Sequence, residues 1–429
     1  MDMHTAQALV RFGLGRSGDQ AVPGDVSAWL TRQLAGPDPA RFSFAPSTAD
    51  GLAALRFDRE NKPPPDERQV GPLFKADAAA TLAQAVSTQA PFRERLVWFW
   101  TNHFTVSLRQ GGVRPIAGAF MREAIRPYVN GKFGDMLLAV MRHPAMLLYL
   151  DNAQSVGANS VAGMRQHRGL NENLARECLE LHTVSVAGGY TQADVTAFAN
   201  ILTGWSVEMK NPPPGFMFRP NAHEPGPKTV MGHGFPPGEE GGVMALAFLA
   251  QHPATHRFLA TKLVRHFVAD DPPADAVRKI EGVLRDTRGD LGAASAALVA
   301  LPAAWQPETK LRSPQDFVFA TMRGVPFPAD KQPDPVGALG ALGQPLWNAP
   351  LPNGWPDRAN DWAGPEALLR RVDWSWALAG RAGDVDAAEL AEANLGPLLK
   401  PATQDAIRRA GSRREALTLF LASPEFQRR

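Results

Sequence analysis

Hydrophobic residues recur along most of the chain at the three- and four-residue spacing of an amphipathic helix. Residues 25–37, "DVSAWLTRQLAGP", are the fullest example: Asp25 can cap the helix start, Gly36 can end it and Pro37 cannot continue it. Further helices are expected at 74–89, 92–104, 116–129, 133–143, 144–152, 171–182, 191–205, 242–252, 253–268, 274–287, 290–302, 313–325, 366–380 and 412–423. This pattern predicts a mainly α-helical, multi-helical fold.

Several of these helices share one kind of boundary, in which proline opens the next segment. Proline suits the first helical turn because its missing N–H has no partner there in any case. The boundary occurs at His143-Pro144, His252-Pro253, Leu301-Pro302 and Ser423-Pro424. These boundaries are irregularly spaced along the chain. They therefore indicate a common type of helix–turn–helix connection and not a solenoid repeat.

Strand patterns are confined to one short region. "FMFR" (216–219) and "KTVM" (228–231) flank the turn-rich segment 220–227, which predicts one small β-hairpin. Proline-rich segments bracket it, as an insertion between helical units would require. We therefore expect two helical lobes around a central polar-faced helix, with the alternative that they form one continuous domain. The expected divisions are an N-terminal lobe at 1–205, the hairpin insertion at 206–240 and a C-terminal lobe at 241–429.

Composition narrows the range of partners. The 429 residues carry a net charge of +2, so no nucleic-acid partner is expected. No apolar run reaches the ~18 residues of a membrane span. Cys178 is the only cysteine, which rules out an intramolecular disulfide. The first 20 residues lack the pattern of a signal peptide, and both a cytoplasmic and a periplasmic location stay open.

The segment "NENLARECLELH" (171–182) concentrates the charged residues of the expected central helix. At about 100° per residue, five polar side chains share one face, whereas His182 falls on the apolar side. Three of them follow i, i+4, i+8 spacing and can form a Glu–Arg–Glu ladder, worth only ~0.3–0.5 kcal/mol per pair on a surface. The five are Glu172, Asn173, Arg176, Glu177 and Glu180.

This polar face has two interpretations. It is either the solvated side of an amphipathic helix or the wall of a cavity. In a cavity, Glu172, Glu177 and Glu180 could bind a divalent metal ion, with Glu177 as ligand or general base. Arg176 and Asn173 would then contact an anionic or polar substrate, since the arginine fork suits carboxylates and phosphates.

Four residues elsewhere are further candidates. His103 shares a helix face with aromatic residues, so it is either a satisfied core histidine or a catalytic residue. His223 and Lys228 lie in the hairpin region and form either an anion-binding, catalytic lip or an exposed turn. Trp355 lies in the long loop 348–365, where aromatic residues usually pack against something or contact a ligand.

Taken together, several stretches resemble the bacterial domain-of-unknown-function family number 1800. They are "RFGLG", "FWTNHFTVS", "YLDN", "NENLARECLELHTVSVAGGYTQADV", "LTGW", "HEPGPKTVMG", "HPATHRFLATKLVRHFV", "DDPP" and "NGWPD". The resemblance assigns no activity. It implies a partner, because members are often encoded beside a second uncharacterised family that is similar to sulfatases. Cys178 and Ser185 depart from the family pattern, so no role of the thiol is implied.

Two hypotheses about function follow. The first is an enzyme, metal-assisted and hydrolase-like, that acts on an anionic or polar substrate beside the central helix. The second is a non-enzymatic scaffold or partner of the sulfatase-like protein, with Trp355 and Trp362 as its interaction surface. No G-x-S-x-G elbow, H-E-x-x-H helix or G-x-G-x-x-G turn occurs in a usable context, which disfavours serine hydrolase, zincin and dinucleotide-binding functions.

Overall fold

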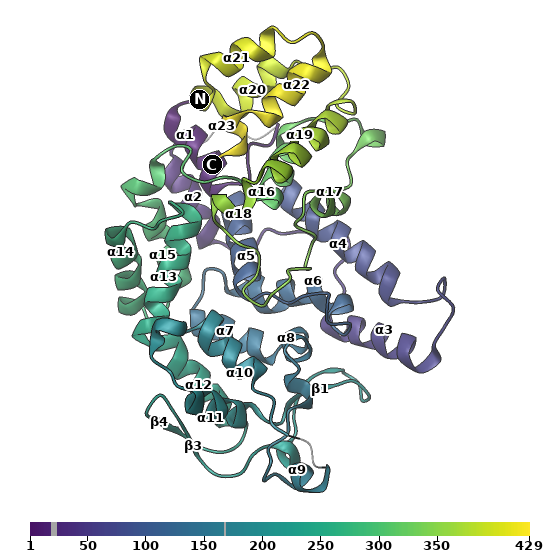
Figure 1. The fold of residues 1–429 in the computed structure, drawn as a ribbon, viewed down its shortest axis with the longest axis vertical. Coiled ribbons are helices and arrows are strands. Elements are labelled where there is room, and N and C mark those ends of the chain that lie inside the picture. Colours follow the sequence, from purple (N-terminus) through teal and green to yellow (C-terminus); the bar gives the residue numbers. More distant parts are fainter. Residues whose placement is uncertain (19–23, 167–168) are drawn as a thin grey trace.

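A computed structural model describes residues 1–18, 24–166 and 169–429, and helices dominate it (Figure 1). The mainly α-helical expectation is confirmed, with strands limited, in these ranges, to residues 205–235. The C-terminal helices lie at one end of the long axis and the strands at the other, and both chain termini lie near the C-terminal helices (Figure 1).

The first half of the chain supplies the middle of the molecule and a projecting pair of helices, α3 and α4 (Figure 1). Its helices are α1 (Met3–Gln7), α2 (Val26–Ala35), α3 (Thr48–Asn61), α4 (Val70–Ser87), α5 (Pro91–His103), α6 (Ala117–Phe120), α7 (Phe133–Arg142), α8 (Pro144–Tyr149), α9 (Val161–Gln166), α10 (Asn173–Glu177) and α11 (Gln192–Leu202).

The second half adds a side layer, α13 to α15, and the C-terminal group (Figure 1). Its helices are α12 (Glu239–Gln251), α13 (Pro253–Phe267), α14 (Ala274–Asp286), α15 (Leu291–Val299), α16 (Pro314–Gly324), α17 (Pro335–Ala341), α18 (Ala359–Trp362), α19 (Pro365–Ala379), α20 (Ala387–Leu395), α21 (Pro401–Arg408), α22 (Arg413–Ala422) and α23 (Pro424–Gln427).

Helix α5 lies at the centre because nearly its whole length is buried. Pro91 occupies its first turn, and its charged residues are compensated inside the protein. Glu94, for example, accepts two hydrogen bonds from Arg126, at 2.7 and 2.9 Å. Since a buried charge is tolerated only with a partner, these pairs explain how a charged sequence forms a core helix.

One aromatic cluster joins distant parts of the chain to α5. The ring of Phe12 lies 5.5 Å from that of Phe92 on α5 and 5.8 Å from that of Phe267 on α13. Buried hydrophobic residues from Ala6 to Phe426 belong to the same continuous cluster. This packing holds α5 and α13 side by side, and the division into two lobes stays a prediction.

The proline boundaries behave as expected. His143 and His252 each precede a proline and cap the following helix through Nδ1, which accepts the N–H of Ala145 at 3.1 Å and of Ala254 at 3.2 Å. The hydroxyl of Ser423 caps α23 in the same way. A polar residue before proline therefore marks a helix start here, because it satisfies an N–H that the helix leaves free.

The small β region is present, but its pairing differs from the expected one. β1 (Trp205–Glu208) pairs with β2 (Gly215–Phe218), and β3 (Lys228–Val230) pairs with β4 (His233–Phe235). The two expected strands thus pair with their nearest neighbours and not with each other. The observed pairings have shorter connecting loops than the expected one, and closing a shorter loop costs less conformational entropy.

The central helix is also shorter than its pattern suggested. α10 ends at Glu177, and residues Cys178–His182 form a π-helical turn. Leu174, Ala175 and Cys178 are buried, which confirms the apolar side of the segment.

No described helix is both long and apolar enough to cross a membrane.

Candidate functional site

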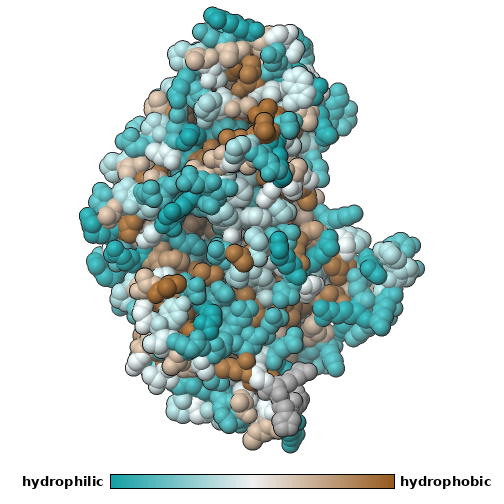
Figure 2. All heavy atoms as spheres, in the orientation of Figure 1, coloured by the Kyte–Doolittle hydropathy of each residue, from teal (hydrophilic) through white to brown (hydrophobic). Residues whose placement is uncertain are grey.

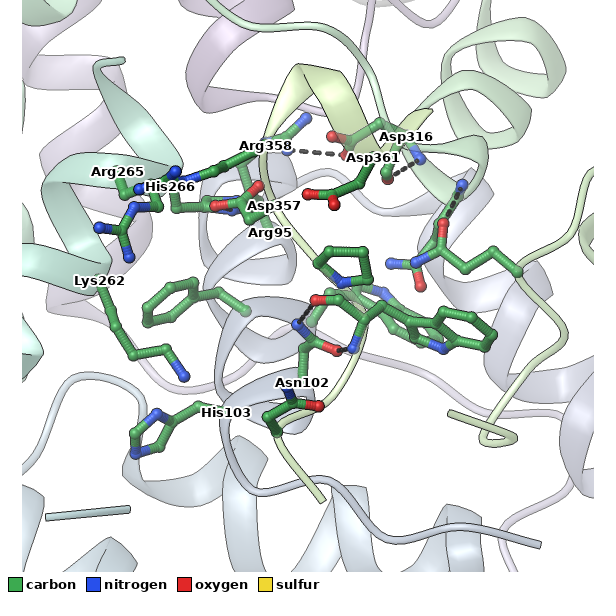
Figure 3. Close-up of a pocket in the computed structure, with 18 of the residues that line it drawn as sticks. Arg95, Asn102, His103, Lys262, Arg265, His266, Asp316, Asp357, Arg358 and Asp361 are labelled. Carbon is green, nitrogen blue, oxygen red and sulfur yellow. Dashed lines mark hydrogen bonds and ion pairs between the residues drawn. The ribbon is translucent and has the colours of Figure 1, made fainter. Parts of the chain in front are cut away.

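A cavity of about 270 Å³ opens between α5, α13, the start of α16 and the loop before α19 (Figure 3). Its volume lies near the lower end of the ~300–1,000 Å³ of small-molecule sites. Aromatic residues, among them Trp355, share the lining with the charged or polar residues Arg95, Asn102, His103, Lys262, Arg265, His266, Asp316, Asp357, Arg358 and Asp361.

Helical periodicity explains how two helices supply most of these groups. On α13, Lys262, Arg265 and His266 follow i, i+3, i+4 spacing and therefore share one face. On α5, Arg95 and Asn102 are separated by two turns and face the same cavity. The two faces meet because the aromatic cluster holds the helices together.

The loop that completes the cavity is fixed to α5 by Asn102. The side-chain amide of Asn102 donates to the carbonyl of Trp355 at 2.9 Å, and its oxygen accepts the N–H of Trp355 at 2.7 Å. Gly354 makes this approach possible. It has φ +78°, and a Cβ there would lie 2.4 Å from the carbonyl oxygen of Asn102. The backbone contact requires glycine at this position.

Replacing Gly354 by alanine should lower the free energy of unfolding by about 1–2 kcal/mol, the usual cost of a left-handed residue with a side chain. The added methyl group must also push the loop away from Asn102. Chemical denaturation measures the effect. The matched control is Gly364→Ala, because no atom lies within 4 Å of a Cβ at Gly364. Equal losses in both variants would contradict this account of the loop.

Asp357, carried by this loop, pairs with His266 of α13. Oδ2 of Asp357 lies 3.0 Å from Nδ1 of His266, a distance at which the ring nitrogen donates and the carboxylate accepts. Nε2 of His266 is buried and has no partner among the described residues. The arrangement orients the ring and leaves one nitrogen without a hydrogen bond, as in a general-base dyad.

The protonation states agree with this arrangement. Burial lowers the pKa of His266 to about 4, against the opposing effect of Asp357. The imidazole is therefore neutral at pH 7, and Nε2 can accept a proton. Burial by itself would raise the pKa of Asp357, but His266, Lys310 and Arg429 outweigh it and hold that pKa below its ordinary value.

A buried charge network supports the dyad from behind. The carboxylate of Asp316 forms ion pairs with two guanidinium groups, with N–O distances of 2.8 Å to Arg95 and 2.9 Å to Arg429. These two guanidinium groups overcome the effect of burial and lower the pKa of Asp316 to about 2. Nη2 of Arg429 also lies 3.6 Å from Oδ1 of Asp357. Lys310, fully buried, pairs with Asp270 and lies 3.8 Å from Asp357. The carboxylates of the site are thus held ionised.

Three cations at the cavity have no such compensation. Among the described residues, no carboxylate lies within ion-pair distance of Lys262, Arg265 or Arg358. In the described ranges, Arg265 makes one long contact, 3.4 Å, from Nε to the carbonyl oxygen of Asp270. Burial lowers the pKa of Lys262 to about 8. The cavity therefore presents unpaired positive charge beside the neutral His266, a combination that favours an anionic ligand.

His103 borders the same cavity from α5. It is 1% exposed, and its Nε2 lies 3.2 Å from the carbonyl oxygen of His182. Its Nδ1 has no partner in the part of the chain that the structure describes. Burial and the nearby Lys262 hold the pKa of His103 well below its ordinary value. His103 is thus a buried neutral histidine with one unused nitrogen at the cavity wall.

The structure brings only two of the sequence-derived candidates, His103 and Trp355, to this cavity. The polar face of α10 lies elsewhere. There Glu172 pairs with Arg176 at 2.9 Å and accepts hydrogen bonds from Gln192 and Thr196 of α11. Of the expected Glu–Arg–Glu ladder, the Glu172–Arg176 pair is present. The hydrogen bonds of Glu172 connect the start of α10 to α11.

The remaining members of that face show no convergence on His103. Glu180 lies 3.5 Å from the hydroxyl of Tyr190, and Asn173 begins α10. Burial and the neighbouring Glu180 raise the pKa of Glu177. In the described ranges, no three His, Cys, Asp or Glu side chains form a group that could hold a metal ion. The predicted metal site at Glu172, Glu177 and Glu180 therefore has no ligand cluster to support it.

His223 and Lys228 make contacts with the backbone of the small β region, and the catalytic lip stays a prediction. Nδ1 of His223 lies 2.9 Å from the carbonyl oxygen of Thr203, and Nε2 accepts the N–H of Gly238 at 2.8 Å. Both ring nitrogens are therefore used by the backbone, and the side chain is buried. Lys228 donates to the carbonyl of Glu224. Their observed contacts tie the small β region together.

Sequence reasoning missed Lys262, Arg265, His266, Asp357 and Arg358. One signal was available: the three α13 residues share a helical face, and both their segment and "NGWPD" belong to the stretches that resemble one family. That resemblance can be tested. The sequence profile of the family described as "Protein of unknown function (DUF1800)" matches residues 7–428.

The chain belongs to the DUF1800 family. The match covers nearly the whole chain, so all segments that build the cavity lie inside the family domain. No curated protein and no solved structure matches the chain. The function of this DUF1800 protein is therefore inferred from the geometry of its cavity.

Proposed function

We propose that the protein is an enzyme that binds a small anionic substrate between α5 and α13 and uses His266 as general base. The Asp357–His266 pair carries the proposal. It lies at a cavity wall, its imidazole is neutral, and Nε2 has no partner among the described residues. An unsatisfied buried nitrogen is costly in a folded protein, and a bound ligand or water would satisfy it.

Each neighbouring group has a role in this proposal. Arg265 and Arg358 would hold the anionic part of the substrate, since guanidinium groups bind carboxylate and phosphate in a fork geometry. Asp357 orients His266 and would stabilise the imidazolium that forms when the base accepts a proton. The proton would come from the substrate or, in a hydrolase-like reaction, from a bound water molecule.

Anion binding is the first test. Phosphate, citrate and glyoxylate should each raise the melting temperature of the protein at low ionic strength, and Arg265→Gln should weaken this stabilisation at least about tenfold in ligand concentration. Arg278→Gln is the control, because Arg278 is exposed on α14 and lies outside this cavity. Identical titrations of wild type and Arg265→Gln, or no stabilisation by any anion, would overturn the proposal.

The scaffold hypothesis assigned an interaction surface to Trp355 and Trp362, and this surface is largely covered. Trp362 is buried, and Trp355 packs against it with ring centroids 6.2 Å apart. A different apolar row is exposed on α19 and consists of Leu368, Leu369, Val372 and Trp376. Hydrophobic side chains are visible in the upper part of the molecule, where α19 lies (Figures 1 and 2). The sulfatase-like partner itself stays a prediction.

A further inference from the structure

We infer that Lys262 is a nucleophile that forms an imine with a carbonyl group of the anionic substrate. This inference rests on the proposed function and narrows its substrate class to small anionic aldehydes and ketones. Three observations support it: the position of Lys262 relative to His266, its lack of a carboxylate partner, and its surroundings.

Position is the first observation. Lys262 and His266 are four residues apart on α13, so their side chains are neighbours on one helical face. Figure 3 shows the side chain of Lys262 extending from α13 toward His103, across the space between the two helices. A carbonyl compound attached to Lys262 would therefore lie next to His103, in the same cavity whose wall carries His266.

The second observation is a contrast between Lys310, which is fully buried, and Lys262, which is half-buried. Lys310 is compensated, because its ammonium group contacts Asp270 and the carbonyl of Asp357. Lys262 lines the cavity, and no carboxylate lies within ion-pair distance of it in the described part of the chain. A fully buried lysine such as Lys310 needs a charged partner, whereas the amine of the half-buried Lys262 stays available to a ligand in the cavity.

The third observation concerns the environment of the amine. Nζ lies 5.5 Å from the centre of the Phe258 ring, and His103 and His182 are both neutral. Burial, with Arg265 adding to it, lowers the pKa of Lys262 to about 8, against the effect of Asp357. About a tenth of the amine is then unprotonated at pH 7, far more than for an ordinary lysine. Reactive lysines are activated by this combination of desolvation and a neighbouring cation.

The reaction balances without an oxidant or reductant. The lone pair of Nζ attacks the carbonyl carbon, and the carbonyl oxygen gains a proton to give a carbinolamine. Loss of one water molecule then leaves the imine, so that amine and carbonyl become imine and water. A protonated imine withdraws electrons from the neighbouring carbon, whose proton His266 could then accept.

Reductive trapping tests the inference. Full-length protein is incubated with glyoxylate and sodium cyanoborohydride at pH 7, and modified lysines are located by peptide mass spectrometry. We expect a carboxymethyl group on Lys262, formed at least about tenfold faster than on Lys279, which is exposed on α14. Lys262→Arg should lose this adduct, whereas Lys279→Arg should retain it.

The same samples separate this inference from the proposed function. Glyoxylate that stabilises the wild-type protein but labels Lys262 no faster than Lys279 would overturn the imine and leave the anion site intact. If glyoxylate neither stabilises the protein nor labels Lys262, both proposals fail. Fast labelling of Lys262 that is suppressed by excess phosphate supports both, because the anion then competes for the site that guides the aldehyde to the lysine.

Discussion

Replacing Asp357 by asparagine should lower the free energy of unfolding by about 3 kcal/mol, at the lower end of what removing one partner of a buried ion pair costs. The carboxylate of Asp357 lies close to His266, Lys310 and Arg429, and the last two are almost completely buried. Asparagine has a similar shape but no charge, so both cations lose part of their compensation. Each keeps one other carboxylate, which limits the loss.

Chemical denaturation at pH 7 measures this effect. Asp361→Asn is the matched control, because Asp361 lines the same cavity but is exposed, and no ion pair to it occurs in the described ranges. The control should change stability by less than about 0.5 kcal/mol. The difference should shrink at acid pH: the pKa of Asp357 is lowered, so its contribution is present above pH 4 and disappears as the carboxylate is protonated. Equal effects of the two substitutions would contradict the network.

The second large effect concerns pH. His182 is 1% exposed, and neither ring nitrogen has a partner among the described residues. Burial, with Lys262 nearby, lowers its pKa to about 3. In the unfolded chain the imidazole gains a proton below about pH 6.5, whereas in the folded protein it stays neutral. The unfolded state therefore binds more protons, and stability must fall as the pH drops from 6.5 toward 4.

At about 1.4 kcal/mol for each pH unit, His182 alone should account for about 3 kcal/mol of that loss at pH 4. His182→Leu should therefore flatten the dependence of unfolding free energy on pH in this window. The measurement is denaturation at several pH values between 4 and 7. His233→Asn, which changes an exposed histidine on β4, should leave the wild-type slope unchanged. If the slope of unfolding free energy against pH is the same in His182→Leu and wild type, His182 gains its proton in the folded state as readily as in the unfolded chain.

Most of the longer helices could be predicted from local patterns, although α3, α20 and α21 were not expected. The cap at Asp25, the box formed by Thr191 and Asp194, and the proline boundaries are all present in the structure. Such signals are readable because each depends on residues that are neighbours in the chain. The π-helical turn at Cys178–His182 was missed, since its extra residue follows from packing and has no local marker.

Most of the residues that line the cavity were not among the candidates from the sequence, for a related reason. The face of α10 concentrates charge in sequence, but its observed contacts are local ones to α11. The cavity collects its charges from α5, α13 and a loop near residue 357, whose charged residues lie 91 or more positions apart in the chain. Asn102 binds this loop at Trp355, a contact between positions 253 apart that has no marker in the local sequence.

By itself, the sequence determined the family, the helical class and most helix starts, because these depend on short-range hydrogen bonds and on the spacing of apolar residues. Only the tertiary structure decided which strands pair, and which charged residues share a cavity. Pairing of Asp357 with His266 requires two segments 91 positions apart to meet, and that contact follows from the packing of α5 against α13. The polar residues that matter most here are ordinary in their local sequence, and burial beside distant partners gives them their altered protonation.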